Sequence, residues 1–352
     1  MKFGITVSQI REVDLAVRAE AQGYDFVWAW DSPLLRSHVW SVLTLVAART
    51  STIRLGPGVA IPGLAMAPVT ANAVATLNAI APGRTFLGLG TGNTAMRTMG
   101  QLPMRLAEFR EHITVIRSLL ERRPVAHTAN GVTHEIAFQS MELDYIDLDH
   151  PIPIHVGGFG PRAQALAGEL GDGLITGIPR GGTIPAALTN VARGADQAGR
   201  SLVDFETTAL VNLVMLEPGE DLESDRVIDE VGSSLMVNVH YLYDRYLEVG
   251  AEPPAHVEPI WDEYVAFRAE RDAHRSHTDA HATHYGSLDP LEARFVTPEM
   301  IRAFCLAGQP GDIVEQLQEL QSQGLDGINF VAPADRQWEL CDTFAERVIA
   351  RM

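Results

Sequence analysis

The residues best suited to bind a ligand form a glycine-rich segment near the middle of the chain. The apolar run Ile154–Val156 ends in glycines, and an alanine-rich segment follows directly. This order predicts a strand, a glycine loop and a helix. Glycines let a backbone approach a ligand closely, and the first turn of a helix offers N–H groups that suit phosphate. The same pattern is compatible with a tight turn that binds nothing. The loop residues are Gly157, Gly158, Phe159, Gly160, Pro161 and Arg162.

The elements that would position this loop alternate between strands and helices. Helices are expected at 106–120 and 310–323, among other places. Alternation of this kind predicts parallel strands joined by crossover helices, and eight strands are the number that closes a barrel. We therefore predict an α/β fold, a (β/α)8 TIM barrel, with a doubly wound open sheet as the alternative. The expected strands are 1–7, 24–30, 53–60, 85–89, 153–156, 173–176, 207–216 and 327–331.

One domain over residues 1–352 accommodates this pattern, with two departures from the repeat. Residues 123–150 contain Pro124, Gly131 and several polar positions, and are expected to lie outside the repeat. Residues 218–300 form an oversized insertion between the seventh and eighth strands. Segments of that length in a compact domain are usually functional, often as lids. Aromatic residues of the insertion would either line a substrate mouth or pack the insertion; they are Tyr241, Tyr243, Tyr246, Trp261, Tyr264 and Phe267.

The composition restricts the class of partner. The 352 residues carry a formal net charge of -18, which opposes binding to nucleic acid or to an anionic membrane. No apolar run is long enough to span a bilayer, and only Cys305 and Cys341 are present, far apart. We expect a cytoplasmic protein that acts on a small molecule.

Small or polar residues follow successive predicted strands. In a barrel, ligand chemistry is placed at these carboxyl ends. Small side chains there leave room for a large flat ligand, which favours a bound cofactor. These residues are Asp31 and Ser32 after the second strand, Gly58, Val59 and Ala60 after the third, Asn93 after the fourth, Gly157–Pro161 after the fifth, and Thr176 and Gly177 after the sixth.

Three of these side chains are candidates for catalysis. Asp31 could accept a hydrogen bond or exchange a proton, or it could cap the segment that follows. Ser32 could donate to a cofactor, with capping as its alternative role. Asn93 offers both a donor and an acceptor, although asparagine after glycine is also common in turns.

Four histidines in the insertion have spacings of three and four residues. Such spacing would place imidazoles on one helical face, where they could bind a metal. The charged and polar residues between them favour a solvated segment instead, and no metal site is predicted. The four are His274, His277, His281 and His284.

Taken together, the motifs resemble the luciferase-like flavin and deazaflavin oxidoreductases, in the branch similar to methylenetetrahydromethanopterin reductase. The resemblance covers most of the chain and is weakest in 218–290. It is carried by Asp31–Leu35, by Ile53–Val59 with Pro62, by Ala75–Leu77 through Arg84, by Leu89–Gly92, by Gly158–Arg162, by Arg294–Glu299 and by the closing segment Gly308–Gly327.

The resemblance implies a homodimeric barrel that holds FMN or coenzyme F420. The phosphate would lie on Gly157–Arg162, and the ring system near Asp31, Gly58–Ala60 and Asn93. Similar proteins often have a non-prolyl cis peptide in the segment matching Gly58–Ala60, which forms a bulge behind the ring. Thr176 and Gly177 complete the expected cofactor site.

The chain also departs from this family. Dehydrogenases of the family have a histidine at the position of Ser32 and an acid at that of Asn93. Relatives tend to have an asparagine before Pro62 and an arginine-histidine pair at Ala65 and Met66, where this chain has Ile61 and two apolar residues. Their acid/base machinery is therefore not carried over.

The function predicted from these observations is F420-dependent hydride transfer to or from a small carbonyl, imine or enone compound. One alternative is an FMN-dependent monooxygenase. A second is a non-catalytic protein that binds a flavin or deazaflavin.

Overall fold

The computed structural model describes residues 1–178, 182–272, 287–333 and 335–352. The chain divides into two compact units. Unit 1 contains Met1–Gly177, Gly181–Ala209 and Gln323–Asn329, and unit 2 consists mainly of Leu210–Ser322 and Phe330–Met352. The strand-end residues singled out above all belong to unit 1.

Eight parallel strands follow one another in the order β3-β2-β1-β11-β9-β8-β7-β4. Parallel bridges from Leu55 to Thr85 and from Ala60 to Leu89 connect β3 with β4, the two ends of this order, so the sheet closes on itself. The predicted (β/α)8 barrel is therefore confirmed. The strands are β1 (Lys2–Thr6), β2 (Phe26–Ala29), β3 (Arg54–Pro57), β4 (Leu87–Leu89), β7 (Ile154–Gly157), β8 (Gly173–Gly177), β9 (Glu206–Met215) and β11 (Gly327–Phe330).

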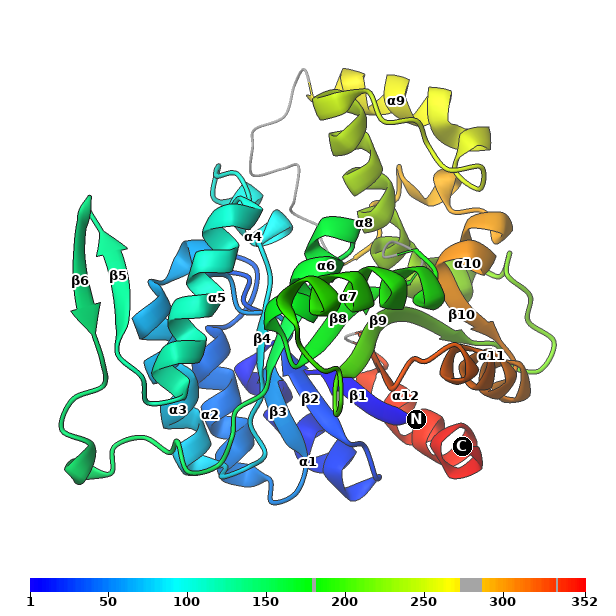
Figure 1. Cartoon of the computed structure of the whole chain (residues 1–352). Helices are drawn as coiled ribbons and strands as arrows, with labels where there is room; N and C mark the ends of the chain where they lie inside the picture. The colour runs from blue at the N-terminus through cyan, green and yellow to red at the C-terminus, as the bar shows by residue number, and fades with distance from the viewer. Residues whose placement is uncertain (179–181, 273–286, 334) are drawn as a thin grey trace. The chain divides into compact units, whose positions relative to one another are not determined.

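Helices cover the outer face of the unit 1 strands because alternate strand residues are apolar on that face. Ile154 and Val156 of β7, for example, pack into a core shared with Phe109 and Leu166 of the helices. Neighbouring helices α2, α3 and α5 lie side by side (Figure 1). The unit 1 helices are α1 (Val13–Ala21), α2 (Val39–Arg49), α3 (Ala67–Ile80), α4 (Asn93–Thr98), α5 (Leu106–Leu120), α6 (Pro161–Leu170) and α7 (Ile184–Ala198).

The interior of the barrel is filled by aromatic rings that lie against glycines. A Cβ atom at Gly4 would lie 2.2 Å from the Phe26 ring, and one at Gly56 would lie 2.7 Å from the Phe86 ring. The imidazole of His155 stacks on Phe86 with ring centroids 5.3 Å apart. Glycine is thus required where a neighbouring strand sends a ring across the interior.

Residues 123–150 contain a β-hairpin that the sequence analysis did not predict. Strands β5 (Val125–Ala129) and β6 (Val132–Ile136) pair in antiparallel fashion beside α5 (Figure 1). Asn130 and Gly131 form the turn, both with positive φ, as a two-residue hairpin requires. The Asn-Gly pair was the signal for this hairpin.

Unit 2 has its own core, which buries Val231, Leu235, Met300 and Ile301. A strand that was not predicted, β10 (Cys305–Gly308), pairs in parallel with the end of β9 within this unit. The remaining elements are α8 (Asp225–Val249), α9 (Glu258–Asp272), α10 (Pro298–Phe304), α11 (Pro310–Ser322) and α12 (Gln337–Arg347).

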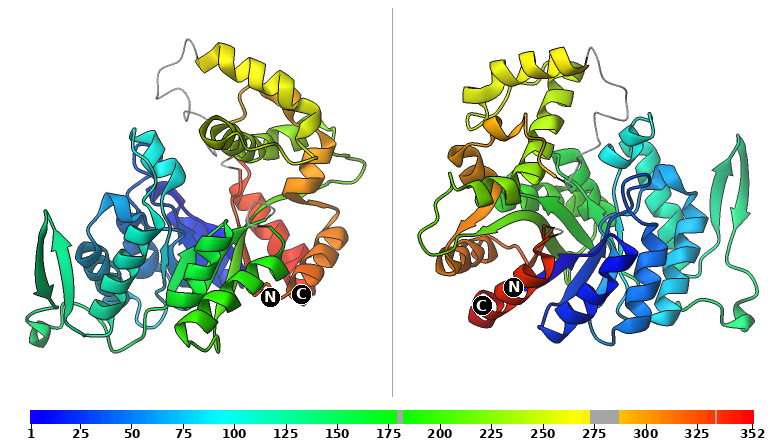
Figure 2. Two further views of the ribbon diagram at one scale, coloured as in Figure 1. Left: turned by 45° about the horizontal axis from the view of Figure 1, so that its top comes forward. Right: turned by 180° about the vertical axis from the view of Figure 1, so that it is seen from behind.

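The aromatic side chains of the insertion pack against one another. Helices α8 and α9 lie next to each other within unit 2 (Figure 2). The Tyr243 and Tyr264 rings meet edge to face at 6.1 Å, and those of Tyr246 and Trp261 do so at 5.8 Å. Tyr243, Trp261 and Tyr264 are buried in the unit 2 core, so they support packing rather than a substrate mouth.

His274, His277, His281 and His284 lie outside the described residues. Within the described ranges, no group of three or more histidine, cysteine, aspartate or glutamate side chains is placed to hold a metal ion. None of the described helices combines the length and apolar character that crossing a membrane requires.

Candidate active site

The glycine loop after β7 packs against β8 and against the start of α6. Gly158 donates its N–H to the Ile175 carbonyl of β8 at 2.9 Å. A Cβ atom at this glycine would lie 3.0 Å from the Ala163 carbonyl carbon, whereas one at Gly160 would meet no atom within 4 Å. The loop therefore packs tightly on its inner side and is open at its tip.

Helix α6 begins at this tip. Gly160 is its N-cap residue and Pro161 its first residue, and no side chain caps the helix. Proline fits the first helical position because its missing N–H would have no partner inside the helix. The first turn therefore presents N–H groups and the positive end of the helix dipole on the open side of the loop.

A buried glutamine that the sequence analysis missed fixes the loop. Gln164 is 1 % exposed and donates from Nε2 to the Phe159 carbonyl at 3.2 Å. Its Oε1 accepts from Asn190 Nδ2 of α7 at 2.8 Å. The loop conformation therefore depends on α7 as well as on α6.

The bulge after β3 contains the non-prolyl cis peptide expected from the family resemblance, between Gly58 and Val59. Hydrogen bonds from Ala60 N to the Gly88 carbonyl (2.8 Å) and from Gly90 N to the Ala60 carbonyl (3.1 Å) tie this bulge to β4. A Cβ atom at Gly90 would lie only 2.5 Å from Val59 Cγ2. Glycine directly after β4 thus leaves the space that the Val59 side chain occupies.

Asp31 lies directly beside this bulge. Its Oδ2 accepts the Ile61 N–H at 3.0 Å. Asp31 is not the cap of α2, whose N-cap residue is His38. Burial raises the pKa of the Asp31 carboxyl above its ordinary value, although the Ile61 hydrogen bond and the charge of His38 act in the opposite direction. A raised pKa makes such a carboxyl better suited to holding or passing a proton.

Ser32 and Asn93 offer polar groups at the same end of the barrel. Ser32 is half-buried. Asn93 is the first residue of α4, where an irregular segment was expected, and its Oδ1 accepts from Arg97 Nε at 3.0 Å. This asparagine is therefore held by its own helix, and its amide N–H2 remains available as a donor.

Thr176 and Gly177 end β8, the strand that pairs with β7. Thr176 is 1 % exposed, and its Oγ1 has no partner within the described part of the chain. A Cβ atom at Gly177 would lie 2.8 Å from Phe159, so this glycine makes room for the Phe159 ring. The unpaired Thr176 hydroxyl and the open loop fit a cofactor phosphate, because phosphate accepts hydrogen bonds from both.

Three further polar residues inside the barrel were missed at the sequence level. Thr6, Ser8 and Asn329 are buried near the carboxyl ends of β1 and β11. The signal for Asn329 was a single polar residue in the apolar run GINFV, and the strand-end residues of the first and eighth strands were not considered.

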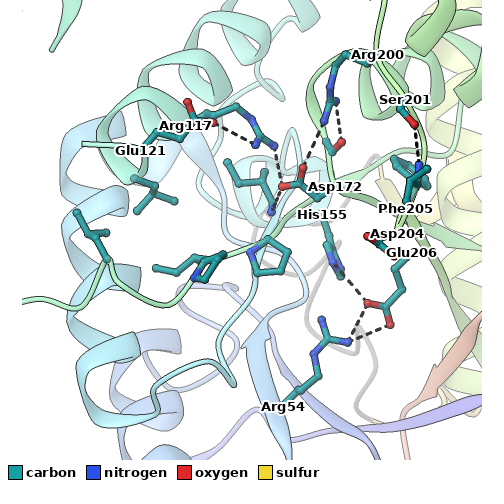
Figure 3. A pocket seen from close by; sticks show the side chains of 18 of the residues that line it. Arg54, Arg117, Glu121, His155, Asp172, Arg200, Ser201, Asp204, Phe205 and Glu206 are labelled. Atoms are coloured by element: carbon teal, nitrogen blue, oxygen red, sulfur yellow. Dashed lines mark hydrogen bonds and ion pairs between the residues drawn. The ribbon is translucent and has the colours of Figure 1, made fainter. Parts of the chain in front are cut away.

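The 680 Å³ pocket in Figure 3 lies at the opposite, amino-terminal end of the strands. Glu206 binds Arg54 at 2.9 Å and Lys2 at 3.1 Å, and the His155 Nε2 atom lies 3.8 Å from it. Asp172 binds Arg117 at 2.8 Å. The charged groups therefore satisfy one another, and this end of the barrel is an ion-pair network rather than the candidate active site.

A (β/α)8 barrel with a glycine loop, a helix start and a bulge at the carboxyl ends of its strands defines a cofactor-binding barrel. The luciferase-like monooxygenase family model matches residues 7–327, and the chain belongs to this family.

Individual relatives support this assignment. The chain is 31% identical to the 5,10-methylenetetrahydromethanopterin reductase of Archaeoglobus fulgidus, covering 93% of this chain and 92% of the relative. It is 33% identical to the F420-dependent glucose-6-phosphate dehydrogenase of Kineococcus radiotolerans over 60% of this chain and 66% of the relative. The coenzyme F420 dependent tetrahydromethanopterin reductase of Methanopyrus kandleri has the same fold, with a TM-score of 0.72, 23% identity and 99% of each chain covered.

Proposed function

We propose that the protein is an oxidoreductase that binds coenzyme F420 and transfers a hydride to or from a small carbonyl, imine or enone compound. Relatives named for F420-dependent reactions support this cofactor. The observation that carries the proposal is the combination of the open loop tip at Gly160 with the unpaired, buried Thr176 hydroxyl. Both features fit a phosphate, which coenzyme F420 carries.

The residues of the site would have separate roles. The loop Gly157–Arg162 and the Thr176 hydroxyl would hold the phosphate. The bulge at Val59 would support one face of the ring system. Ser32 and the Asn93 amide would donate hydrogen bonds, and Asp31 would hold the proton that balances hydride transfer. Bound F420 supplies the hydride chemistry, and the chain supplies binding, orientation and electrostatics.

The first experiment is titration of the purified protein with F420 and with FMN. Binding is followed through tryptophan fluorescence and through the absorbance of the cofactor. Selective and tight binding of F420 is the expected result, and it would direct a substrate screen toward ketones, imines and enones. Binding of neither cofactor would contradict the proposal.

An FMN-dependent monooxygenase is the second candidate, favoured by the name of the family model. The loop and bulge bind through backbone and shape, features that suit either cofactor. Reduced flavin reacts readily with oxygen and deazaflavin does so poorly. Oxygen uptake with bound, reduced cofactor therefore separates this candidate from the first. Tight binding of a cofactor without any turnover would instead indicate a non-catalytic binding protein.

We also propose that the protein is a cytoplasmic homodimer. Both cysteines are buried and lie far apart in the sequence, which fits a reducing compartment. Exposed apolar side chains occur on α2 and α3, namely Leu45, Val69 and Ile80. A second copy of the chain would cover this surface. Light scattering of the purified protein should give twice the chain mass, and Val69→Glu should lower it to a single chain.

A further inference from the structure

A buried amide inside the barrel has an unused donor. Strands β1 and β11 are neighbours, and Thr6 Oγ1 donates to Asn329 Oδ1 at 2.6 Å. Asn329 is 0 % exposed, and its Nδ2 has no hydrogen-bond partner within the described ranges. Because Thr6 occupies Oδ1, the Nδ2 group is directed away from Thr6.

Thr6 and Asn329 belong to a layer of neighbouring side chains inside the barrel, and this layer reaches the bulge. Thr6 is the register partner of Trp28 on β2. The Trp28 ring in turn packs against Gly58, where a Cβ atom would lie 2.6 Å from it. The layer therefore runs from Asn329 through Thr6 and Trp28 to Gly58, so it joins the unused donor to the proposed support of the ring system.

A second unused group lies just beyond the end of β1. Ser8 is two residues beyond Thr6, so in extended backbone both side chains point to the same face. Its N–H is bound by Glu12 Oε2 at 2.9 Å, which fixes the backbone. Its Oγ is buried and lacks a partner in the described part of the chain.

Buried donors without a partner are rare because they lose hydrogen bonds to water without replacing them. Two such groups near the carboxyl ends of β1 and β11 therefore indicate a ligand with oxygen acceptors. The rings of F420 and FMN both carry two carbonyl oxygens on their pyrimidine portion, whereas the bulge offers only backbone and an aliphatic side chain.

We infer that Asn329 Nδ2 donates a hydrogen bond to a ring carbonyl of the bound cofactor, with Thr6 fixing the orientation of the amide and Ser8 providing a second hydroxyl. This inference rests on the proposed function, because it requires a tricyclic cofactor in the barrel. Asn329 thereby positions the ring on the bulge without taking part in hydride or proton transfer.

The test compares two variants with the wild-type protein. The double variant Thr6→Val with Asn329→Leu removes both partners of the hydrogen bond, so neither group is left unpaired and the fold is retained. The control is Thr208→Val, which alters a buried threonine of β9 whose hydroxyl bonds the Leu174 carbonyl at 3.4 Å. Each protein is titrated with F420 and FMN, and difference infrared spectra record the carbonyl bands of the bound cofactor.

We expect the double variant to bind the cofactor about tenfold more weakly. One carbonyl band should move to higher frequency, while the control keeps both the affinity and the band positions. An unchanged dissociation constant, or weaker binding with unshifted carbonyl bands, would overturn the inference and leave the proposed function intact. If the wild-type protein binds neither cofactor, the proposed function itself fails, and the inference fails with it.

Discussion

Asp31 combines two roles that substitution can separate. Its Oδ2 holds the Ile61 N–H beside the bulge, and burial raises the pKa of its carboxyl. A raised pKa means that the folded protein holds this proton more tightly than the unfolded chain does. The folded state therefore loses stability as pH rises from the ordinary pKa of the carboxyl to its raised pKa. The charged carboxylate therefore destabilises the fold at neutral pH.

Asp31→Asn should keep the acceptor for Ile61 and remove the charge. We expect an unchanged or slightly raised melting temperature together with loss of most turnover, on the order of 100-fold, because proton transfer is removed. Asp31→Ala should lose turnover and also weaken cofactor binding, since the bulge is released. Calorimetry, cofactor titration and steady-state kinetics measure the three effects. Full turnover by the asparagine variant would exclude Asp31 as a proton carrier.

His155 should make the stability depend on pH. Burial lowers the pKa of His155 to about 4. Between this value and the ordinary value near 6.5, the unfolded state binds more protons, so stability is complete above about pH 6.5 and falls toward pH 4. A shift of this size corresponds to about 3 kcal/mol.

His155→Gln should flatten the pH dependence of the unfolding free energy in this window, measured by urea unfolding. His112 contributes a similar slope, because burial and His127 lower its pKa to about 4, and this slope remains in the variant. His134→Gln, at an exposed hairpin position, is the matched control and should leave the profile unchanged. A wild-type profile in the His155 variant would contradict the burial argument.

At the scale of single elements, the loop between β7 and α6 permits a charge test of the phosphate position. Gly160 is the N-cap of α6, has ordinary extended backbone angles and faces open space. Aspartate and asparagine are both favourable N-cap residues, so Gly160→Asp and Gly160→Asn should fold normally. Only aspartate places a negative charge where the phosphate is proposed to bind.

We therefore expect Gly160→Asp to weaken F420 binding at least tenfold more than Gly160→Asn does, which corresponds to about 1.4 kcal/mol. The deazaflavin core of F420, which lacks the phosphate, should bind both variants with similar affinity. Fluorescence titration with the two ligands measures the difference. Equal losses for F420 and for its core would place the phosphate elsewhere.

The elements differ in how well the sequence predicted them. All eight barrel strands and helix α5 were predicted because strand and helix patterns alternate regularly there. The hairpin β5–β6 was missed because its strands are exposed and lack an apolar pattern, although Asn130-Gly131 marked the turn. Strand β10 was missed because its pairing with β9 depends on contacts between distant segments.

The candidate site was predicted only in part for the same reason. The glycine loop and bulge are local patterns, and the cis peptide between Gly58 and Val59 followed from the family resemblance. Gln164 and Asn329, by contrast, act through partners 26 and 323 residues away. No local pattern indicates which buried amide will find such a partner.

At the scale of the whole molecule, one carboxylate joins strands that lie far apart in the sequence. Glu206 begins β9 and binds Arg54 of β3, with His155 of β7 nearby (Figure 3). It also binds Lys2 of β1. Burial alone would raise the pKa of Glu206, but Arg54, His155 and Lys2 together lower it. Glu206 therefore stabilises the barrel above the ordinary carboxyl pKa, and this contribution is lost as pH falls through the lowered value.

Glu206→Gln should reduce the free energy of unfolding by about 2 to 3 kcal/mol at pH 7. This loss of stability is just below the range that is typical when one partner of a buried ion pair is removed, because Arg54 and Lys2 also reach solvent. The deficit should narrow as the pH falls below 4.5, since the wild-type carboxylate then takes up a proton. Urea unfolding across this pH range measures both effects. Glu108→Gln, which breaks an exposed pair with Arg105, is the control and should cost less than about 0.5 kcal/mol. A deficit that does not change with pH would show that Glu206 acts through packing rather than through its charge.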